Sequence, residues 1–174
     1  MPIEIYTVGS SRLGSEMRAH AALLQDVVDS GASIGFLPPL DPVTAVTYWH
    51  DLIKELEESR VLLLAAYDGN TLLGSVQLGL ETRKNGLHRA EVRKLMVHTT
   101  ARRMGIATKL MEAAESNASM RGRRLLVMDT RKGDSAEILY RKLGYAEAGE
   151  IPRYARDKDG NLHATVFFYK ELIP

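Results

Sequence analysis

The sequence predicts a three-layer α/β fold, in which a mixed central sheet is covered by helices on both faces. Segments with strand-like apolar runs alternate with segments whose apolar residues recur at three- and four-residue steps. They follow one another in the order βααβββαβαββ, and no repeat, low-complexity tract or linker interrupts them. A chain of 174 residues suits one folding unit, so we expect a single domain over residues 1–174.

The N-terminal segment predicts a strand and a long helix. Residues 2–8 alternate as a short strand. Apolar residues at helical spacing over residues 12–30 predict a helix that Gly31 ends. His20 lies on the apolar face of this helix, where it is either a packed core histidine or a titrating functional group.

A loop with an apolar composition and a second helix come next. Residues 31–40 carry glycines and two adjacent prolines, which do not suit a regular element. The loop also carries Ile34, Phe36 and Leu37, which either plug the end of the core or line a substrate pocket. An Asp-Pro pair then begins a helix over residues 41–59, with Asp as N-cap and Pro in the first turn.

Three strands in a row start the central sheet. Residues 61–67 are a near-continuous apolar run, residues 68–70 a tight turn, and residues 71–82 a returning strand. A further turn at residues 84–86 leads into a strand over residues 89–97. We therefore expect an antiparallel meander.

The C-terminal part predicts a crossover followed by a helix and two strands. A buried strand over residues 125–129 follows a helix that begins after the preceding strand, so the two strands should be parallel. Residues 134–143 predict a helix, residues 145–149 a strand, and residues 163–170 a last strand after a turn at residues 159–161.

The charges are unevenly distributed although the net charge is only +1. Residues 1–88 carry 6 Lys and Arg against 11 Asp and Glu, whereas residues 89–142 carry 13 against 6. A ligand with several phosphates would account for this basic stretch, and so would an ordinary solvated face. The small net charge gives no reason to expect a nucleic-acid partner.

The basic stretch contains a side-chain-poor helix start. Residues 102–108 join the end of a strand to an amphipathic helix, and Gly105 and Ala107 leave the first turn open. Free backbone N–H groups and the helix macrodipole make such a turn a binding site for phosphate oxygens. Arg102 and Arg103 add positive charge.

This Arg-x-x-Gly-x-Ala pattern after a strand resembles the acetyl-CoA signature of the GNAT acetyltransferase superfamily. A second motif, Ala-Glu-Ile-Leu-Tyr-Arg-Lys-Leu-Gly-Tyr over residues 136–145, resembles the family's helix that carries a tyrosine and ends at Leu-Gly-Phe/Tyr. The resemblance implies a GNAT-like strand order with splayed central strands. It also implies that acetyl-CoA is the cosubstrate, held by a run of strand backbone and by the signature loop: Leu95, Met96, Val97, Arg102, Arg103, Met104, Gly105, Ile106, Ala107 and Thr108.

The second motif supplies a candidate general acid. Tyr140 matches the tyrosine that many family members place near the thioester sulfur, and a phenol can protonate a thiolate of similar basicity. The alternative is a tyrosine that only packs in the core.

Two carboxylates are candidates for the base that an amine acceptor requires, because an alkylamine is mostly cationic at neutral pH. Glu91 lies early on the strand before the signature loop, and Asp129 lies at the carboxyl end of the next strand. We expect them to meet above the sheet and to make the acceptor site acidic. Each could instead face solvent or form an ion pair with Arg93 or Arg131.

One position departs from the superfamily pattern. Many members have Asn seven residues before the tyrosine, where it contacts the cofactor arm, but this chain has Gly133. Three further stretches, residues 31–36, 85–97 and 149–154, resemble the tabtoxin-resistance acetyltransferases within the superfamily. This likeness implies acetylation of a small-molecule amine such as a toxin, an antibiotic or an amino-acid-like metabolite. Acetylation of a protein N-terminus or lysine, or a non-catalytic acetyl-CoA-binding module, are the alternatives.

The sequence lacks the motifs that are typical of several other functional classes. The sequence has no phosphate-binding Gly-x-x-x-x-Gly-Lys-Ser/Thr, no Gly-x-Gly-x-x-Gly and no His-Glu-x-x-His, so we expect no metal. It has no Cys, no basic or strongly apolar N-terminal stretch and no apolar run of about 20 residues. We therefore expect a cytoplasmic protein without a membrane partner, and leave open whether it forms a homodimer.

Overall fold

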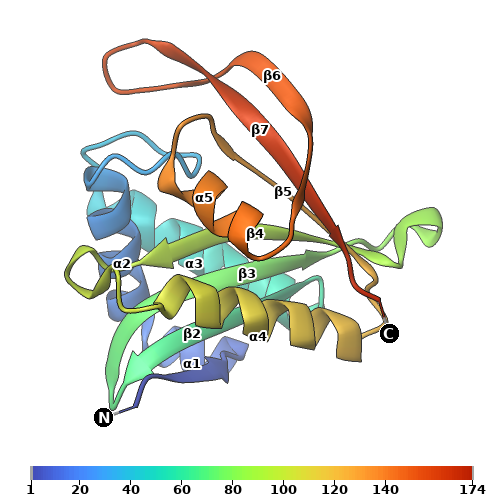
Figure 1. The fold of residues 1–174 in the computed structure, drawn as a ribbon. Coiled ribbons are helices and arrows are strands. Elements are labelled where there is room, and N and C mark those ends of the chain that lie inside the picture. Colours follow the sequence, from blue (N-terminus) through green and yellow to red (C-terminus); the bar gives the residue numbers. More distant parts are fainter. Residues whose placement is uncertain (1, 174) are drawn as a thin grey trace.

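A mixed seven-stranded sheet forms the centre of the molecule, in a computed structural model that describes residues 2–173 (Figure 1). The strand order is β1-β2-β3-β4-β5-β7-β6. Figure 1 shows α4 and α5 in front of this sheet and α1, α2 and α3 behind it. The three-layer α/β fold predicted from the sequence is therefore confirmed.

The helices behind the sheet come from the N-terminal third of the chain. After β1 (Glu4–Thr7) come α1 (Ser10–Ser15) and α2 (Met17–Asp29). The prediction of one unbroken helix was wrong, because the backbone of Glu16 leaves the helical conformation with φ −100° and ψ 13°. The apolar spacing continues across the break, so the periodicity could not reveal it.

The second predicted helix is confirmed as α3 (Pro42–Glu57). The carboxylate of Asp41 accepts a hydrogen bond from the Thr44 backbone N–H at 2.9 Å, which caps the first turn as predicted. With α1 and α2 this helix buries an apolar layer against β2 (Val61–Asp68), in which Trp49 is fully buried. None of the helices within residues 2–173 is long and apolar enough to cross a lipid bilayer.

The front face is dominated by α4 (Ile106–Met120), which packs on β2, β3 (Thr71–Leu80) and β4 (Arg89–Val97). Gly74 on β3 allows the close approach of this helix. A Cβ atom there would stand 2.6 Å from the Met96 carbonyl oxygen and 3.3 Å from a methyl carbon of Ile106. The start of α4 is thus seated directly on the end of β4.

The sheet opens in its middle. β4 and β5 (Leu125–Arg131) are parallel, as the crossover predicts, but they pair only from Arg89 to Glu91 on β4. Beyond that point β5 pairs with β7 (Leu162–Glu171) alone, and the two parallel strands diverge (Figure 1). The edge of β4 that faces β5 therefore has no strand partner beyond Glu91.

A bulge lies on β4 at the same level. Between the pairs Gln77–Arg93 and Ser75–Met96, β4 contains one more residue than β3. Lys94 takes up the extra residue with φ +54°, a left-handed conformation that is uncommon for lysine. Such bulges redirect side chains, and this one lies where the sheet opens.

The C-terminal quarter forms the other side of the opening. α5 (Ser135–Lys142) follows β5, and β6 (Ala146–Arg156) returns along β7 as an antiparallel edge strand. β6 is longer than the predicted strand over residues 145–149. Its extension contains Pro152 and an irregularity of register between Ile151 and Ala155, which an edge strand tolerates because one side needs no hydrogen-bond partner.

Candidate active site

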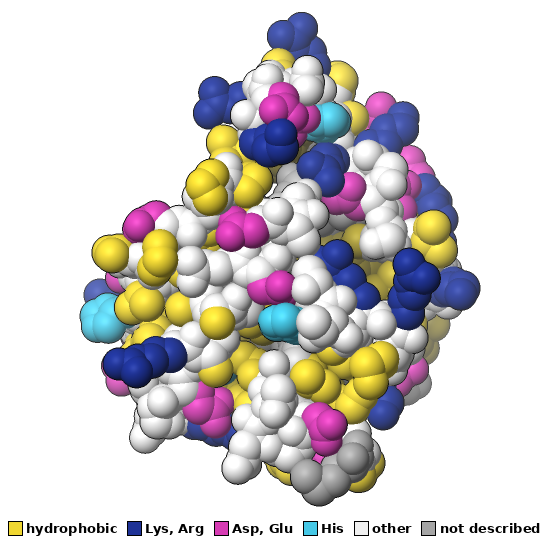
Figure 2. Space-filling view, turned by 90° about the vertical axis from the view of Figure 1, so that its left-hand side faces the viewer, with side chains coloured by type: hydrophobic (Ala, Val, Ile, Leu, Met, Phe, Trp, Pro, Cys, Tyr) yellow, Lys and Arg dark blue, Asp and Glu magenta, His cyan; other side chains and the backbone are white. Residues whose placement is uncertain are grey.

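A cavity of about 690 Å³ lies where β4 and β5 diverge. Figure 2 views the molecule from its open side, where Lys and Arg side chains flank a central hollow. Its walls come from the end of α2 and the following loop, from β4, from the start of α4, and from the β5–α5 connection. The lining residues that matter below are Ser30, Ile34, Arg93, Lys94, Leu95, Val97, Arg102, Arg103, Gly105, Ala107, Thr108, Asp129, Arg131, Asp134, Ser135 and Tyr140.

One end of the cavity is the N-terminus of α4. Gly105 is the N-cap residue with φ +76°, and a Cβ atom built on it would meet nothing within 4 Å. No N-cap side chain occupies the first-turn N–H groups, which are free to donate to an anion. Ala107 and Thr108 line the cavity beside them.

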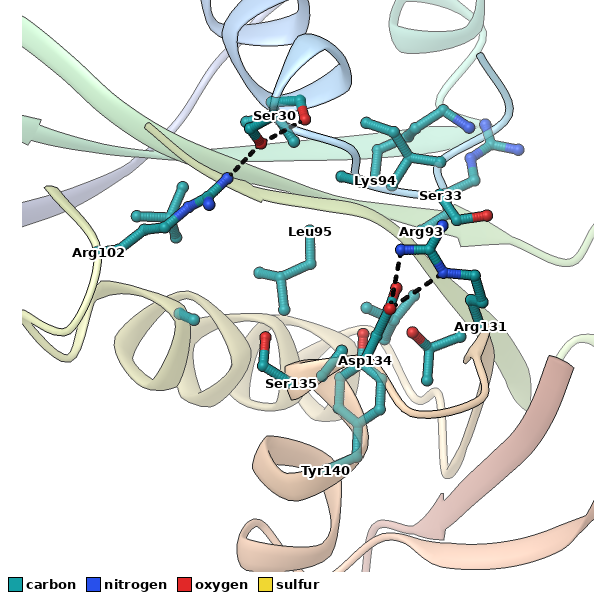
Figure 3. Close-up of a pocket in the computed structure, with 18 of the residues that line it drawn as sticks. Ser30, Ser33, Arg93, Lys94, Leu95, Arg102, Arg131, Asp134, Ser135 and Tyr140 are labelled. Atoms are coloured by element: carbon teal, nitrogen blue, oxygen red, sulfur yellow. Dashed lines mark hydrogen bonds and ion pairs between the residues drawn. The ribbon is translucent and has the colours of Figure 1, made fainter. Parts of the chain in front are cut away.

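The signature loop is held in place by neighbouring elements. The guanidinium of Arg102 donates a hydrogen bond to the Ser30 hydroxyl at 2.6 Å, which ties the loop to the end of α2 (Figure 3). Arg103 has φ +63°, and with Gly105 it gives the backbone the turned shape that presents N–H groups to anions. Met104 and Ile106 do not line the cavity, since the first is exposed and the second is buried in the core.

The middle of the cavity is bounded by the unpaired edge of β4. Leu95 and Val97 line it, and Figure 3 shows the Leu95 side chain pointing into the space. Met96 is 1% exposed and its side chain packs in the core behind the sheet. Unpaired strand N–H and C=O groups on this edge can bond an extended polar chain.

Tyr140 enters the cavity from α5 on the opposite side (Figure 3). Its ring is 5% exposed and packs against Tyr145 and Phe168, with ring centroids 5.9 and 5.7 Å away. Burial, followed by the nearby Asp129 carboxylate, raises the pKa of Tyr140 to about 12. The phenol is therefore protonated at neutral pH and has a proton that it can donate.

The structure separates the two predicted carboxylates. Asp129 lines the cavity and accepts a hydrogen bond from the Thr165 hydroxyl at 2.6 Å. Glu91 lines a second, neighbouring hollow, together with Glu55, Arg60 and Glu81, and it does not line the cavity that contains Asp129. Neither carboxylate forms the ion pair with Arg93 or Arg131 that the sequence allowed, because Arg93 pairs with Glu55 and Arg131 with Asp134.

The departure at Gly133 has a local explanation. Gly133 has φ +88°, and its N–H donates to Glu137 at 2.6 Å in the turn before α5. Asp134, Ser135 and Ala136, the next residues, line the cavity instead. Polar groups at the start of α5 thus occupy the region next to the missing side chain.

Sequence reasoning did not assign to the site the basic residues at the inner end of the cavity, which is the end away from Arg102 (Figure 3). Arg93 and Lys94 lie at the β4 bulge, and Arg131 donates to the Gly31 carbonyl at 3.1 Å across the opening. Ile34 lines the cavity, Phe36 packs against the core, and Leu37 is exposed, so the apolar loop both plugs the core and borders the site. No group of three or more potential metal ligands is gathered anywhere in residues 2–173.

A parallel strand pair diverges beside an open helix N-terminus, with Tyr140 on the opposite side, and this arrangement can accommodate an anionic group at the helix and an extended chain along the strand edge. Comparison with known proteins agrees with this arrangement. The sequence profile described as the acetyltransferase (GNAT) domain matches residues 58–147. An IAA acetyltransferase from Azospirillum brasilense is 29% identical over 106 residues, which are 60% of this chain and 67% of that protein.

Solved structures show the same fold over nearly the whole chain. A protein assigned to the phosphinothricin N-acetyltransferases has a TM-score of 0.83 at 20% identity and covers 99% of this chain and 100% of its own. The ribosomal-protein-alanine N-acetyltransferase of Brucella melitensis has a TM-score of 0.82 at 20% identity, over 97% and 99%. YncA of Salmonella typhimurium, solved with its cofactor acetyl-CoA, has a TM-score of 0.77 at 16% identity, over 98% and 94%.

The chain belongs to the GNAT acetyltransferase domain family. It is an acyltransferase enzyme.

Proposed function

We propose that the protein transfers the acetyl group of acetyl-CoA directly to the amine of a small molecule. One observation carries the proposal: a single cavity joins the open N-terminus of α4, the unpaired edge of β4 and the protonated Tyr140. A donor bound along this path would have its phosphates at one end and its reactive end beside a proton donor. The acceptor would then enter from the inner end, next to Asp129.

The residues present fit acetyl-CoA. The first turn of α4 and the unobstructed Gly105 would hold the pyrophosphate, with Arg102 and Arg103 contributing positive charge. Leu95 and Val97 would pair their backbone groups with the pantetheine arm as a further strand would. Ser135 or Asp134 would take the place of the family's Asn, since both line the cavity next to Gly133.

Acetyl-CoA supplies an activated acetyl thioester, and the chain supplies the proton transfers. Tyr140 holds a proton at its phenol oxygen and gives it to the departing thiolate. Asp129 accepts, directly or through water, the proton that the acceptor's ammonium group must lose before the resulting amine attacks the thioester. Glu91, which lines the neighbouring hollow and not this cavity, is left with at most an electrostatic role.

A small acceptor is supported by the loop over residues 31–40, which borders the inner end of the cavity with Ile34 and Ser33. The resemblance of residues 31–36, 85–97 and 149–154 to the tabtoxin-resistance acetyltransferases points the same way, toward detoxification of an amine-bearing toxin or antibiotic. We propose that residues 1–174 act as one domain. A cytoplasmic setting follows from the proposed use of acetyl-CoA.

The test is acceptor screening with purified protein. Thiol release from acetyl-CoA should be measured with a panel of small amines, amino acids and peptides. We expect at least one small amine to be acetylated with a higher kcat/KM than any peptide. Preference for a peptide N-terminus or lysine would replace this proposal by protein acetylation. Binding of acetyl-CoA without turnover of any amine would favour a non-catalytic module.

A further inference from the structure

The β4 bulge directs one lysine into the active-site cavity. Lys94 is the bulged residue, with φ +54°, and it lines the cavity together with Asp129 and Tyr140. Figure 3 shows it on the opposite side of the cavity from Tyr140. A regular strand would have continued its alternation here, so the bulge determines where this side chain lies.

Aromatic rings hold the Lys94 ammonium from one side. Its Nζ atom lies 5.8 Å from the ring centroid of Phe36 and 5.7 Å from that of Tyr48. Tyr48 is fixed in turn, because its hydroxyl exchanges hydrogen bonds of 2.8 and 3.0 Å with the fully buried Gln77. A Cβ atom on Gly35 would lie 3.5 Å from Nζ, so the loop also leaves just enough room for the ammonium.

The ammonium lacks an anionic partner within residues 2–173. Three other basic groups of the cavity have partners: Arg93 pairs with Glu55 at 2.9 Å, Arg131 with Asp134 at 2.9 Å, and Arg102 bonds Ser30. Arg103 also lines the cavity, but it belongs to the loop before α4, where the phosphates of the donor are proposed to bind. Lys94 makes neither a hydrogen bond through Nζ nor an ion pair with any residue in this range. Burial, followed by the neighbouring Arg93, lowers the pKa of Lys94, and the Glu91 and Asp129 carboxylates oppose this only in part because neither forms an ion pair with the ammonium.

Charge is therefore separated across the inner end of the cavity. Asp129 lies on the Tyr140 side, where the amine must react, and Lys94 lies on the β4 side. The phosphates of the donor have their own site at the start of α4, formed with Arg102 and Arg103, so they do not require Lys94. What remains for Lys94 to bind is a negative group on the acceptor.

We propose that Lys94 is a specificity-determining residue that selects an acceptor carrying a carboxylate as well as the reactive amine. The acceptor is an amino-acid-like zwitterion, with its amine toward Asp129 and its carboxylate on the Lys94 ammonium. This inference rests on the proposed small-molecule function and narrows its substrate class.

Matched pairs of acceptors test the proposal in the full-length protein. Amino acids are compared with the amides of the same amino acids, and γ-aminobutyrate with butylamine, by thiol release from acetyl-CoA. The wild type should prefer the carboxylate of each pair. The Lys94→Met variant, which retains the length of the side chain without its charge, should lose about tenfold to hundredfold in kcat/KM for the carboxylates, as expected of a hydrogen bond to a charged group. Its values for the partners without a carboxylate should change by less than about twofold, well below that range.

Three comparisons make the result decisive. Lys94→Arg should retain part of the preference, and Lys84→Met, at an exposed lysine outside the cavity, should retain all of it. An equal loss for both members of every pair, with a lowered melting temperature, would show that Lys94 only packs against the rings and would overturn the inference. A wild type that ignores the carboxylate would also overturn it. A wild type that acetylates peptides but no small amine would instead overturn the proposed function, and this inference with it.

Discussion

Tyr140 is both a residue of the core and a residue of the cavity wall. Its ring belongs to an aromatic cluster with Tyr145 and Phe168, yet its side chain also borders the active-site cavity. The same burial that makes it a core residue raises its pKa to about 12. A packed environment thus keeps the phenol protonated, which is the state that a general acid requires.

Removal of the Tyr140 hydroxyl should affect catalysis far more than folding. Tyr140→Phe keeps the ring and its contacts, so we expect the melting temperature to change little. The kcat should fall by about 10²–10⁴-fold, the usual contribution of general acid catalysis, with little change in acetyl-CoA affinity. Tyr145→Phe is the matched control, because it loses a hydroxyl in the same cluster but outside the cavity. A fall in kcat of less than about threefold would remove Tyr140 from the mechanism.

The two carboxylates should differ in their effect on the reaction. Asp129→Asn removes the acceptor of the ammonium proton beside Tyr140, so kcat/KM should fall by about 10²-fold or more near neutral pH. Glu91→Gln should have a much smaller effect, because Glu91 faces the second hollow. Steady-state rates of both variants across pH provide the measurement. Equal losses in the two variants would contradict the assignment of the two carboxylates to different hollows.

His20 shows that the sequence position of a titratable residue does not reveal its role. It is fully buried against Trp49 at a ring distance of 4.8 Å, and it does not line the cavity. Burial lowers the pKa of His20 from 6.5 to about 4, against the opposing effect of Glu16. The packed interpretation that the sequence allowed accounts for these contacts.

The depressed pKa of His20 predicts a loss of stability in mild acid. Below pH 6.5 His20 of the unfolded chain binds a proton, whereas His20 of the folded chain remains neutral down to about pH 4. The stability that neutral His20 contributes is therefore fully present above pH 6.5. As the pH falls from 6.5 to about 4, the free energy of unfolding decreases by up to about 3 kcal/mol. Urea unfolding at several pH values should show a flatter dependence for His20→Phe than for the wild type. His50→Phe, at an exposed histidine, should leave the dependence unchanged.

At the scale of elements, the start of α4 brings together an anion site and a helix terminus. Ala107→Glu places a carboxylate in the first turn, where the macrodipole favours it by about 0.3–1 kcal/mol. The same carboxylate would repel the pyrophosphate. We expect unchanged or higher thermal stability together with an acetyl-CoA affinity at least about tenfold lower, the loss that a charge conflict of about 1.4 kcal/mol produces.

Calorimetry with Ala107→Gln provides the control for that change, since it adds the same bulk without the charge. Gln should weaken binding less than Glu does, and the difference should shrink at high salt. Equal affinities for the two variants would place the phosphates elsewhere. Gly105 is a poorer position for such a test, because its φ of +76° would strain any β-branched replacement.

The sequence predicted elements well where one periodicity dominates. Residues 89–97 were predicted as a strand and form β4 with the same bounds, because the apolar alternation and the flanking turns agree. The break at Glu16 and the extension of β6 through Pro152 were missed, since the first leaves the apolar spacing intact and the second depends on an edge position in the sheet. Both are consequences of tertiary packing.

In the candidate site, too, local features were predicted from the sequence and features that depend on tertiary packing were not. The helix N-terminus and the position of Tyr140 follow from local motifs, and the structure brings both to one cavity. The bulge at Lys94 comes from the mismatch between β3 and β4 and has no signature of its own. Without the bulge, the alternation of β4 gave no reason to single out Lys94. The alternation of β4 also could not show that Glu91 and Asp129 line different hollows.

At the scale of the whole molecule, the sheet consists of two parts that are joined by one short strand pair. β1 to β4 form one part, β5, β7 and β6 form the other, and β4 and β5 pair over only three residues on each strand. A ligand that occupies the opening contacts both parts. Binding should therefore stabilise the whole fold by mass action, by about 2.7 kcal/mol at a free ligand concentration of 100 times Kd.

Hydrogen exchange can locate that stabilisation. Amides on the unpaired edge of β4 between residues 92 and 97 have no strand partner on the β5 side, so part of this segment should exchange quickly in the free protein. If the pantetheine arm pairs with this edge, acetyl-CoA should slow exchange there by more than it does in β2. The strand β2 serves as the internal control, because it already has partners on both sides in β1 and β3. Coenzyme A without the acetyl group should give the same protection, since the arm is unchanged. Equal slowing in β2 and β4 would mean that the ligand only raises global stability, and would contradict backbone pairing with Leu95 and Val97.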